Sequence, residues 1–295
     1  MRAFTFENAT KIYFGGGCVK EHLLEAVKPY GETVMLAYGG GSIKTNGIYQ
    51  EVMDVLKLAG KQVIEFSGIM PNPTYSKVME GKKVVQENQV DLILAVGGGS
   101  VMDCSKAISM AAATDKDVWE EYWIKKGEID FEPVPVGVIV TVVGTGSEVN
   151  GEGVITHEEQ KIKTSRNYPR CNPVFAMMDP KYTYTVSPLQ TAAGGFDTLS
   201  HVMETYFSAP DEDNLSDAIS EALMRSIIEN LPVAIREPEN YEARSNLMWA
   251  STMAEIGIIK LGKQCDFEAH MIEHQMGAYT DCNHGMGLGV IHPAY

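Results

Sequence analysis

The sequence predicts an α/β domain built on a parallel sheet, followed by an all-helical domain. Three observations predict this fold class. Short β-branched runs alternate with longer amphipathic stretches over the first two-thirds of the chain. Several of these runs lead directly into glycine-rich loops, and the periodicity beyond residue 188 is predominantly helical. We therefore expect one domain over residues 1–187 and a second over residues 188–295.

The length and composition narrow the class of protein further. A chain of 295 residues with 44% apolar residues can bury a sizeable core. Lys and Arg number 24 against 39 Asp and Glu, which gives a formal net charge of −15. Because such a surface repels polyanions, we expect neither nucleic acid nor an anionic membrane as the main partner.

Cysteine usage and the absence of a leader pattern indicate a cytoplasmic location. The five cysteines are scattered and form no Cys-x-x-Cys pair, so neither a disulfide framework nor a thiolate zinc site is expected. Residues 1–8 lack the apolar stretch of a signal peptide. The longest apolar run, residues 136–143, is far shorter than the roughly 20 residues that span a bilayer.

The elements of the first domain follow from the alternation. Strands are expected at residues 33–38, 62–66, 92–96 and 137–143, and helices at residues 47–58 and 75–87.

The second domain is expected to open with a helix at Pro188. Ser187 suits the N-cap of this helix and Pro188 its first position. Helical periodicity continues over residues 189–260, with an acidic loop at Asp211-Glu212-Asp213 and a proline-containing break at residues 236–238.

Three glycine loops follow predicted strands: Gly-Gly-Gly-Ser at 39–42 and at 97–100, and Gly-Thr-Gly-Ser at 144–147. Ligands bind at the carboxyl ends of strands in a doubly wound sheet, and a helix N-terminus behind glycines favours a phosphate. A purely structural alternative is a tight turn in which Ser100 and Asp103 form a capping pair. None of the loops matches the usual dinucleotide fingerprint or the phosphate loop of nucleotide hydrolases. Three loops in one sheet favour a nucleotide site.

Four of the seven histidines lie within the last 26 residues. His270 and His274 are four residues apart on a predicted helix, and His284 follows at the start of another element. Asp197 and His201 have the same spacing on the helix that opens at Pro188. One carboxylate with imidazoles and no thiolate suits Fe²⁺ or Zn²⁺, although a polar pair of this spacing is also common on solvated helix faces. Spacing alone leaves open which of His270 and His274 is the ligand.

The sequence resembles the iron-containing (group III) metal-dependent alcohol dehydrogenases, in particular the branch of butanol dehydrogenases and NADPH-dependent aldehyde reductases. The shared motifs are Pro-Asn-Pro at 71–73, Gly-Gly-Gly-Ser-Val-Met-Asp at 97–103, Thr-Gly-Ser-Glu at 145–148, Gly-Gly-Phe-Asp at 194–197 leading to His201, and His-x-x-x-His-x-Met-Gly-Ala at 270–278 leading to His284 and Gly285. They span both predicted domains in the family's order.

The resemblance implies a dinucleotide-binding α/β domain and an all-α metal-binding domain of the dehydroquinate synthase-like fold. It implies the metal ligands Asp197, His201, His270 and His284, and it leaves His274 near the nicotinamide as the catalytic, proton-relaying residue. The implied cofactor contacts are Gly40, Gly41, Ser42, Asn72, Gly98, Gly99, Ser100, Asp103, Thr141, Thr145, Asn150 and Lys163. It further implies a homodimer that acts on a small alcohol or aldehyde.

The first glycine loop favours NADP(H) over NAD(H). An acidic residue after the first strand would bind the adenosine 2′-hydroxyl and exclude a 2′-phosphate. Glycines and Ser42 occupy that place here, with Lys44 nearby.

The resulting hypothesis is reversible hydride transfer between a primary alcohol or aldehyde and NAD(P)(H), with one divalent metal, Fe²⁺ or Zn²⁺, as the Lewis acid. Members of the resembled family continue through further helices of the metal domain, whereas this sequence stops at Tyr295. We therefore expect helices that pack around the ligands to be missing, and one alternative is an inactive nucleotide-binding protein. The other alternative is a polyol oxidoreductase similar to glycerol dehydrogenase.

Overall fold

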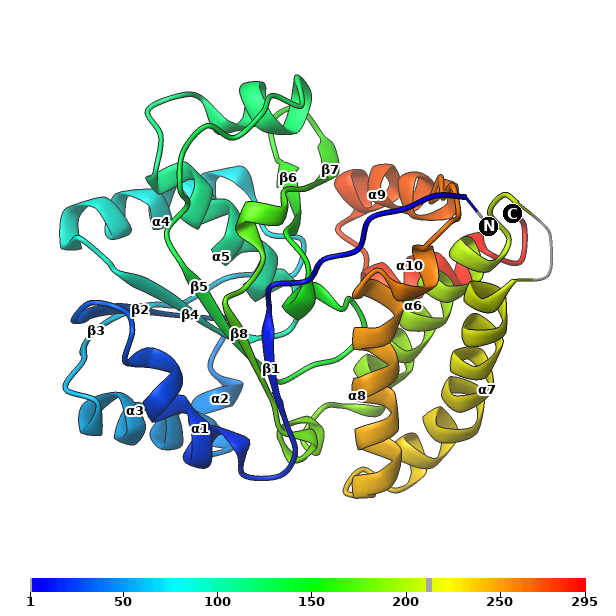
Figure 1. The fold of residues 1–295 in the computed structure, drawn as a ribbon, viewed down its shortest axis with the longest axis horizontal. Helices are drawn as coiled ribbons and strands as arrows, with labels where there is room; N and C mark the ends of the chain where they lie inside the picture. The colour runs from blue at the N-terminus through cyan, green and yellow to red at the C-terminus, as the bar shows by residue number, and fades with distance from the viewer. Residues whose placement is uncertain (1, 211–213) are drawn as a thin grey trace.

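The computed structural model describes residues 2–210 and 214–295, so the expected acidic loop at 211–213 lies outside the described residues. The chain forms an α/β part and a helical part that pack side by side (Figure 1). This arrangement confirms the predicted fold class. In the described part of the chain, no helix is both long and apolar enough to cross a membrane.

The α/β part contains a six-stranded parallel sheet with the strand order β1-β8-β5-β4-β2-β3. Its strands are β1 (Lys11–Phe14), β2 (Thr33–Tyr38), β3 (Gln62–Phe66), β4 (Leu92–Gly97), β5 (Val136–Val140) and β8 (Phe175–Met178). Its helices are α1 (Cys18–Val27), α2 (Ser42–Thr45), α3 (Ile48–Leu58), α4 (Tyr75–Asn88) and α5 (Gly99–Ala112). A two-stranded antiparallel hairpin, β6 (Glu152–His157) and β7 (Ile162–Asn167), stands outside the sheet.

The central strands are apolar because helices cover both faces of the sheet. On β2, Val34 and Leu36 pack with α1 and α3, whereas Met35 and Ala37 pack with α4 and α5 on the opposite face. Successive side chains of a strand point to opposite faces, so a strand covered on both sides must be apolar at every position. This is why the predicted bounds of β2 are correct.

The glycine loops meet at the place where the strand order reverses. β2 pairs with β3 on one side and with β4 on the other, so the chain crosses back over β2 between these two strands. The loops that follow β2 and β4 therefore emerge side by side at the carboxyl edge of the sheet. Such a switch point leaves a crevice in which ligands bind.

One predicted strand extends too far, and four strands were not predicted. β5 ends at Val140, opposite Gly97, because β4 gives way to α5 there and residues 141–143 have no strand to pair with. β1 and β8 are only four residues long. β6 and β7 carry many polar residues and pair mainly with each other.

The helical part is built from α6 (Pro188–Tyr206), α7 (Leu215–Arg236), α8 (Tyr241–Glu255), α9 (Glu268–Thr280) and α10 (His284–Ile291). The Ser187 side chain accepts from the backbone N–H of Gln190, which confirms the predicted N-cap, and α7 ends at Arg236, where the break was expected. A third apolar cluster joins α6, α7 and α8. The domain boundary at residue 187 stays a prediction.

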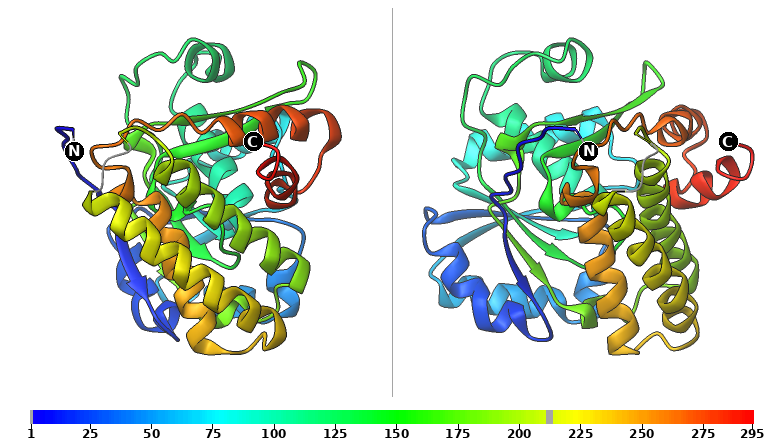
Figure 2. Two further views of the ribbon diagram at one scale, coloured as in Figure 1. Left: turned by 90° about the vertical axis from the view of Figure 1, so that its right-hand side faces the viewer. Right: turned by 45° about the vertical axis from the view of Figure 1, so that its right-hand side comes forward.

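Helix α6 packs closely against the loop that follows β5 and against the start of α10. A Cβ on Gly194 would lie 2.1 Å from the carbonyl oxygen of Val143, and a Cβ on Gly285 would lie 2.1 Å from that of Ala193. Only glycine permits these two approaches, which bring the loop after β5 and the start of α10 onto α6. Figure 2 shows α6 beside α9 and α10, and the N-terminal segment running along the boundary between the two parts.

Candidate metal and cofactor site

Two adjoining cavities lie between the α/β part and the helical part. The first has a volume of about 400 Å³ and is lined by all three glycine loops, by Gly194 and Asp197 of α6, and by residues 282–285. The second has a volume of about 290 Å³ and is lined by His201, His270, His274 and His284. Asn72, Ser100, Thr145 and His284 line both cavities, so the two form one continuous cleft.

The structure brings every predicted cofactor residue to this cleft. The first cavity is lined by Gly40, Gly41, Ser42, Asn72, Gly98, Gly99, Ser100, Thr141 and Thr145. The second is lined by Asp103, Asn150 and Lys163. Their contacts with a cofactor stay a prediction.

The glycines of the cleft fall into two groups. A Cβ on Gly99 would lie 2.4 Å from the Thr145 side chain, so close packing between α5 and the next loop explains this glycine. A Cβ on Gly40 or Gly41, in contrast, would meet no protein atom within 4 Å. Gly41 has a φ of 162°, which is extended backbone. Since neither packing nor strain requires glycine at these two positions, the bare backbone here fits a ligand that approaches it closely.

The expected capping pair of Ser100 and Asp103 is wrong. The helix begins two residues earlier than a Ser100 cap would place it, with Gly98 at the N-cap and no side-chain hydrogen bond there. Asp103 faces away from the helix end: its carboxylate accepts from the Ser147 hydroxyl at 2.5 Å and from the backbone N–H of Val154 at 3.1 Å.

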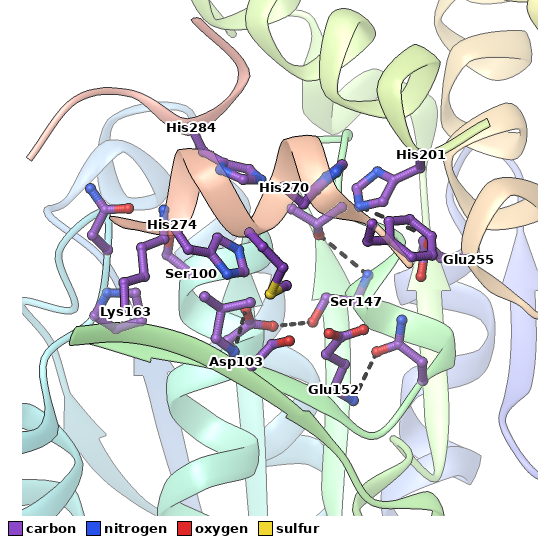
Figure 3. Close-up of a pocket in the computed structure, with 18 of the residues that line it drawn as sticks. Ser100, Asp103, Ser147, Glu152, Lys163, His201, Glu255, His270, His274 and His284 are labelled. Atoms are coloured by element: carbon purple, nitrogen blue, oxygen red, sulfur yellow. Dashed lines mark hydrogen bonds and ion pairs between the residues drawn. The ribbon is translucent and has the colours of Figure 1, made fainter. Parts of the chain in front are cut away.

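Asp103, which Figure 3 shows bonded to Ser147, belongs to a buried polar network around Lys106. The Lys106 ammonium donates to the Ser147 hydroxyl at 2.7 Å and to the backbone carbonyl of Asn150 at 3.1 Å, and lies 3.6 Å from Asp103. Burial lowers the pKa of Lys106 and raises that of Asp103. The network fixes Ser147 and Asn150, which line the second cavity, against α5.

The four predicted metal ligands converge on one carboxylate oxygen. Asp197 Oδ1 lies 3.7 Å from His201 Nδ1, 3.6 Å from His270 Nε2 and 3.5 Å from His284 Nε2. These separations are too long for good hydrogen bonds. Two ligand atoms that share a tetrahedral ion at the usual bond lengths are about 3.4 Å apart. The spacing therefore fits ligands around a common cation.

Buried polar atoms without a partner give the same result. Asp197 Oδ1, His201 Nδ1 and His270 Nε2 are buried and have no hydrogen-bond partner among the described residues. A buried polar atom left unpaired is costly, so an unpaired group of one carboxylate and two imidazoles needs an explanation. A cation that accepts a lone pair from each of them would supply it.

The electrostatics of the cluster favour an ionised carboxylate. Burial alone would raise the pKa of Asp197, but the neighbouring His201, His284 and His270 lower it to about 2. Burial lowers the pKa of His201. For His270, burial also acts to lower the pKa, yet the carboxylates of Asp197 and Glu204 raise it to about 9.

Three carboxylates that were not predicted surround these ligands. Glu204 accepts from His270 Nδ1 at 2.5 Å, and Glu273 accepts from His284 Nδ1. Glu255 Oε1 lies 4.0 Å from His201 Nε2. A carboxylate on the outer nitrogen of a ligating histidine orients the ring and makes the other nitrogen a better donor.

Lys163 contacts one of these three carboxylates, Glu273, directly. Its ammonium is 3.0 Å from Glu273 Oε2, and both side chains are buried. Because the same carboxylate oxygen also accepts from His284, the position of Lys163 is coupled to that of a predicted metal ligand. A direct contact of Lys163 with the cofactor stays a prediction.

His274 is buried on the cavity side of α9 and makes no ion pair with Asp197 within 4 Å in the part of the chain described. Burial, and then the charges of Lys163 and the neighbouring histidines, lower its pKa well below the usual value. Its Nδ1 atom has no hydrogen-bond partner among the residues that the structure describes. His274 is therefore a neutral imidazole at pH 7 with a nitrogen that can accept a proton.

Two family models match the chain. The model described as "Iron-containing alcohol dehydrogenase" matches residues 9–180, and the model for the C-terminal part of the Fe-containing alcohol dehydrogenase family matches residues 191–295. The chain belongs to the iron-containing alcohol dehydrogenase family. Within this family it is similar to butanol dehydrogenases and aldehyde reductases.

Related alcohol dehydrogenases and aldehyde reductases match nearly the whole length of this chain. NADH-dependent butanol dehydrogenase A of Clostridium acetobutylicum is 40% identical over 99% of this chain and 75% of the relative. NADPH-dependent aldehyde reductase YqhD of Escherichia coli is 38% identical over 100% of this chain and 75% of the relative. The crystal structure of NADH-dependent butanol dehydrogenase A from Thermotoga maritima has a TM-score of 0.95 and 37% identity, over 100% of this chain and 73% of that one.

The sequence spacing of two of the unpredicted carboxylates could have indicated their place in the site. Glu204 follows His201 by three residues on α6, and Glu273 follows His270 by three residues on α9. Residues three or four apart share a helix face, so each carboxylate lies beside a predicted ligand. Glu255 lies on α8, and its approach to His201 has no such signal.

Proposed function

We propose that this chain interconverts aldehydes and primary alcohols with a nicotinamide cofactor and one divalent cation. In the reductive direction the aldehyde carbon gains a hydride from the reduced cofactor and the oxygen gains a proton. The convergence of three imidazoles on Asp197 Oδ1, directly beside the glycine-lined cavity, carries the proposal. Family membership and the printed activities of the relatives support it.

Different residues of the chain would bind the cation, orient its histidine ligands and transfer the proton. Asp197, His201, His270 and His284 would hold the cation; one carboxylate and three imidazoles suit Fe²⁺ and Zn²⁺ alike. When bound, the cation would polarise the substrate oxygen and the reduced nicotinamide would supply the hydride. Glu204 and Glu273 fix the rings of His270 and His284. His274 would exchange a proton with the substrate, since its ring lines the cavity.

Metal-dependent turnover tests this proposal. We expect the protein loaded with Fe²⁺ or Zn²⁺ to oxidise NADPH when butanal is added, and the metal-free protein to be inactive; absorbance at the nicotinamide band is the measurement. Oxidation of glycerol without reduction of butanal would favour the polyol alternative. NADPH binding without turnover in the loaded protein would favour the nucleotide-binding alternative. The homodimer implied by the resemblance stays a prediction.

We further propose that the cofactor is NADPH rather than NADH. The loop after β2 presents glycines and Ser42 to the cleft and no carboxylate. Lys44, two residues after Ser42 in the short helix α2, is the first cation that follows this loop in the sequence. Its ammonium lies 2.9 Å from Glu65 Oε2 and over the ring of Tyr49 at 4.5 Å. These contacts hold the ammonium beside the loop, where a 2′-phosphate would share it with Glu65.

Replacing Lys44 with Ala is expected to raise the KM for NADPH about tenfold and to leave the KM for NADH within about twofold, because one charge-assisted phosphate contact is worth somewhat over 1 kcal/mol. Steady-state kinetics with both cofactors measure this. Lys57→Ala removes an exposed cation elsewhere on α3 and serves as the control. Equal changes for both cofactors in Lys44→Ala would contradict the NADPH assignment.

A further inference from the structure

The second cavity is the space in which a substrate would lie, if the proposed function holds. It opens from the histidine cluster on α9 and α6 toward the hairpin β6–β7 (Figure 3). Val154, Phe267 and Met271 provide apolar contacts along it. The remaining wall is polar, and its charges determine which substrates it favours.

The two lysines on this wall are already neutralised. Lys260 lies 2.8 Å from Glu255, and Lys163 lies 3.0 Å from Glu273. In each pair the carboxylate is buried. A carboxylate on a substrate would have to compete with these partners, so neither lysine offers a free positive charge.

Two carboxylates on the same wall have no such partner. Glu152 begins β6 and is half-buried, and Asp266 precedes the turn into α9. Among residues 2–210 and 214–295, no lysine, arginine or histidine nitrogen lies within 4 Å of either carboxylate. Glu152 rises from the hairpin toward the cavity, opposite the histidines of α9 (Figure 3). Lys106, Lys260 and Arg166 act on Glu152 only at longer range, so the charge on the cavity wall that has no direct partner is negative.

We propose that Glu152 determines substrate choice, and that the enzyme prefers short aldehydes that carry an ammonium group at the end remote from the carbonyl. The carbonyl would face the cluster of His201, His270 and His284, the short carbon chain would contact Val154 and Met271, and the ammonium would meet Glu152. Attraction between unit charges at a partly buried site is several times stronger than in bulk water. This inference rests on the proposed function and names the substrate class of that same site.

A matched pair of substrates isolates the charge. 3-Aminopropanal and butanal differ only in an ammonium in place of a methyl group. We expect kcat/KM for 3-aminopropanal to exceed that for butanal about tenfold with the metal-loaded enzyme and NADPH. In Glu152→Gln this ratio is expected to fall to about one, while Glu159→Gln, which removes the same charge from an exposed position on the same hairpin, is expected to keep it.

Charge reversal and binding without turnover give two independent measurements. Glu152→Lys is expected to shift the preference toward succinic semialdehyde, whose remote group is a carboxylate. Calorimetry with NADPH present, where an alcohol cannot react, is expected to show 3-aminopropan-1-ol binding about tenfold more tightly than butan-1-ol to the wild type and equally to Glu152→Gln.

The outcomes separate this inference from the proposed function. Absence of turnover with every aldehyde would overturn the proposed function. Turnover with equal kcat/KM for the matched pair, or a preference that Glu159→Gln abolishes as strongly as Glu152→Gln, would overturn only the role of Glu152. A preference for 3-hydroxypropanal over both substrates would also overturn it, since a hydroxyl group would then be favoured over a positive charge.

Discussion

Replacing Asp197 with Asn is expected to lower turnover at least a thousandfold and to raise the Kd for Zn²⁺ at least a hundredfold. Asp197 Oδ1 is the atom that faces His201, His270 and His284 at 3.5–3.7 Å, so its charge holds the cluster together. The amide keeps the shape of the side chain but loses the charge that favours a cation. Metal content after dialysis and steady-state NADPH oxidation measure the two effects.

Two further variants show whether the effect is specific to the cluster. Glu204→Gln removes the partner of His270 Nδ1, and we expect a tenfold to hundredfold loss of metal affinity, the usual cost of an outer carboxylate. Asp54→Asn removes an exposed carboxylate on α3, and we expect no change. Wild-type metal affinity in Asp197→Asn would contradict the assignment of the metal to this cluster.

Replacing His274 with Ala is expected to lower kcat about a hundredfold while the metal content stays at the wild-type level. General acid–base catalysis by a positioned imidazole typically contributes a factor of this size. His274 lines the cavity, and its Nδ1 atom is buried without a partner, whereas the nitrogens around Asp197 belong to other histidines. Steady-state kinetics and metal analysis on the same preparation measure the two quantities.

Chemical rescue makes this prediction specific to proton transfer. Added imidazole is expected to restore part of the activity of His274→Ala and to leave the wild type unchanged. His22→Ala, on α1 and outside both cavities, is the control and is expected to retain full activity. If His274→Ala loses its metal along with its activity, His274 is a ligand and the proton-relay role is wrong.

The sequence predicted the fold where burial imposes a clear pattern. β2 was predicted with its correct bounds because its apolar run ends at Gly39, and β3 because its mixed run of apolar and polar residues ends before Ser67 and Gly68. The ends of β5 depend on where its neighbour β4 stops, which no local pattern reveals. β8 is a run of Phe, Ala and Met without β-branched residues, and it becomes a strand through its pairing with β1 and β5.

The candidate site was predictable to the same extent. Helical spacing pointed to the pairs Asp197 with His201 and His270 with His274, and the resemblance supplied the choice among them. Lys106, in contrast, gave no signal, because its partners are backbone and side-chain oxygens about 40 residues along the chain. Glu152 also gave no signal in the sequence, because it reaches the cavity wall through the hairpin β6–β7, which was not predicted.

The loop after β5 affects whether the α/β part or the helical part could be replaced by that of a relative. Gly144 donates its backbone N–H to the Ser251 hydroxyl, and the buried carboxylate of Glu148 accepts from Thr252, both on α8. Burial raises the pKa of Glu148. A chimera joined near residue 187 would place this carboxyl group against a foreign helix. The two halves are therefore not interchangeable modules, and a successful graft must carry the Ser251-Thr252 pair with the helical half.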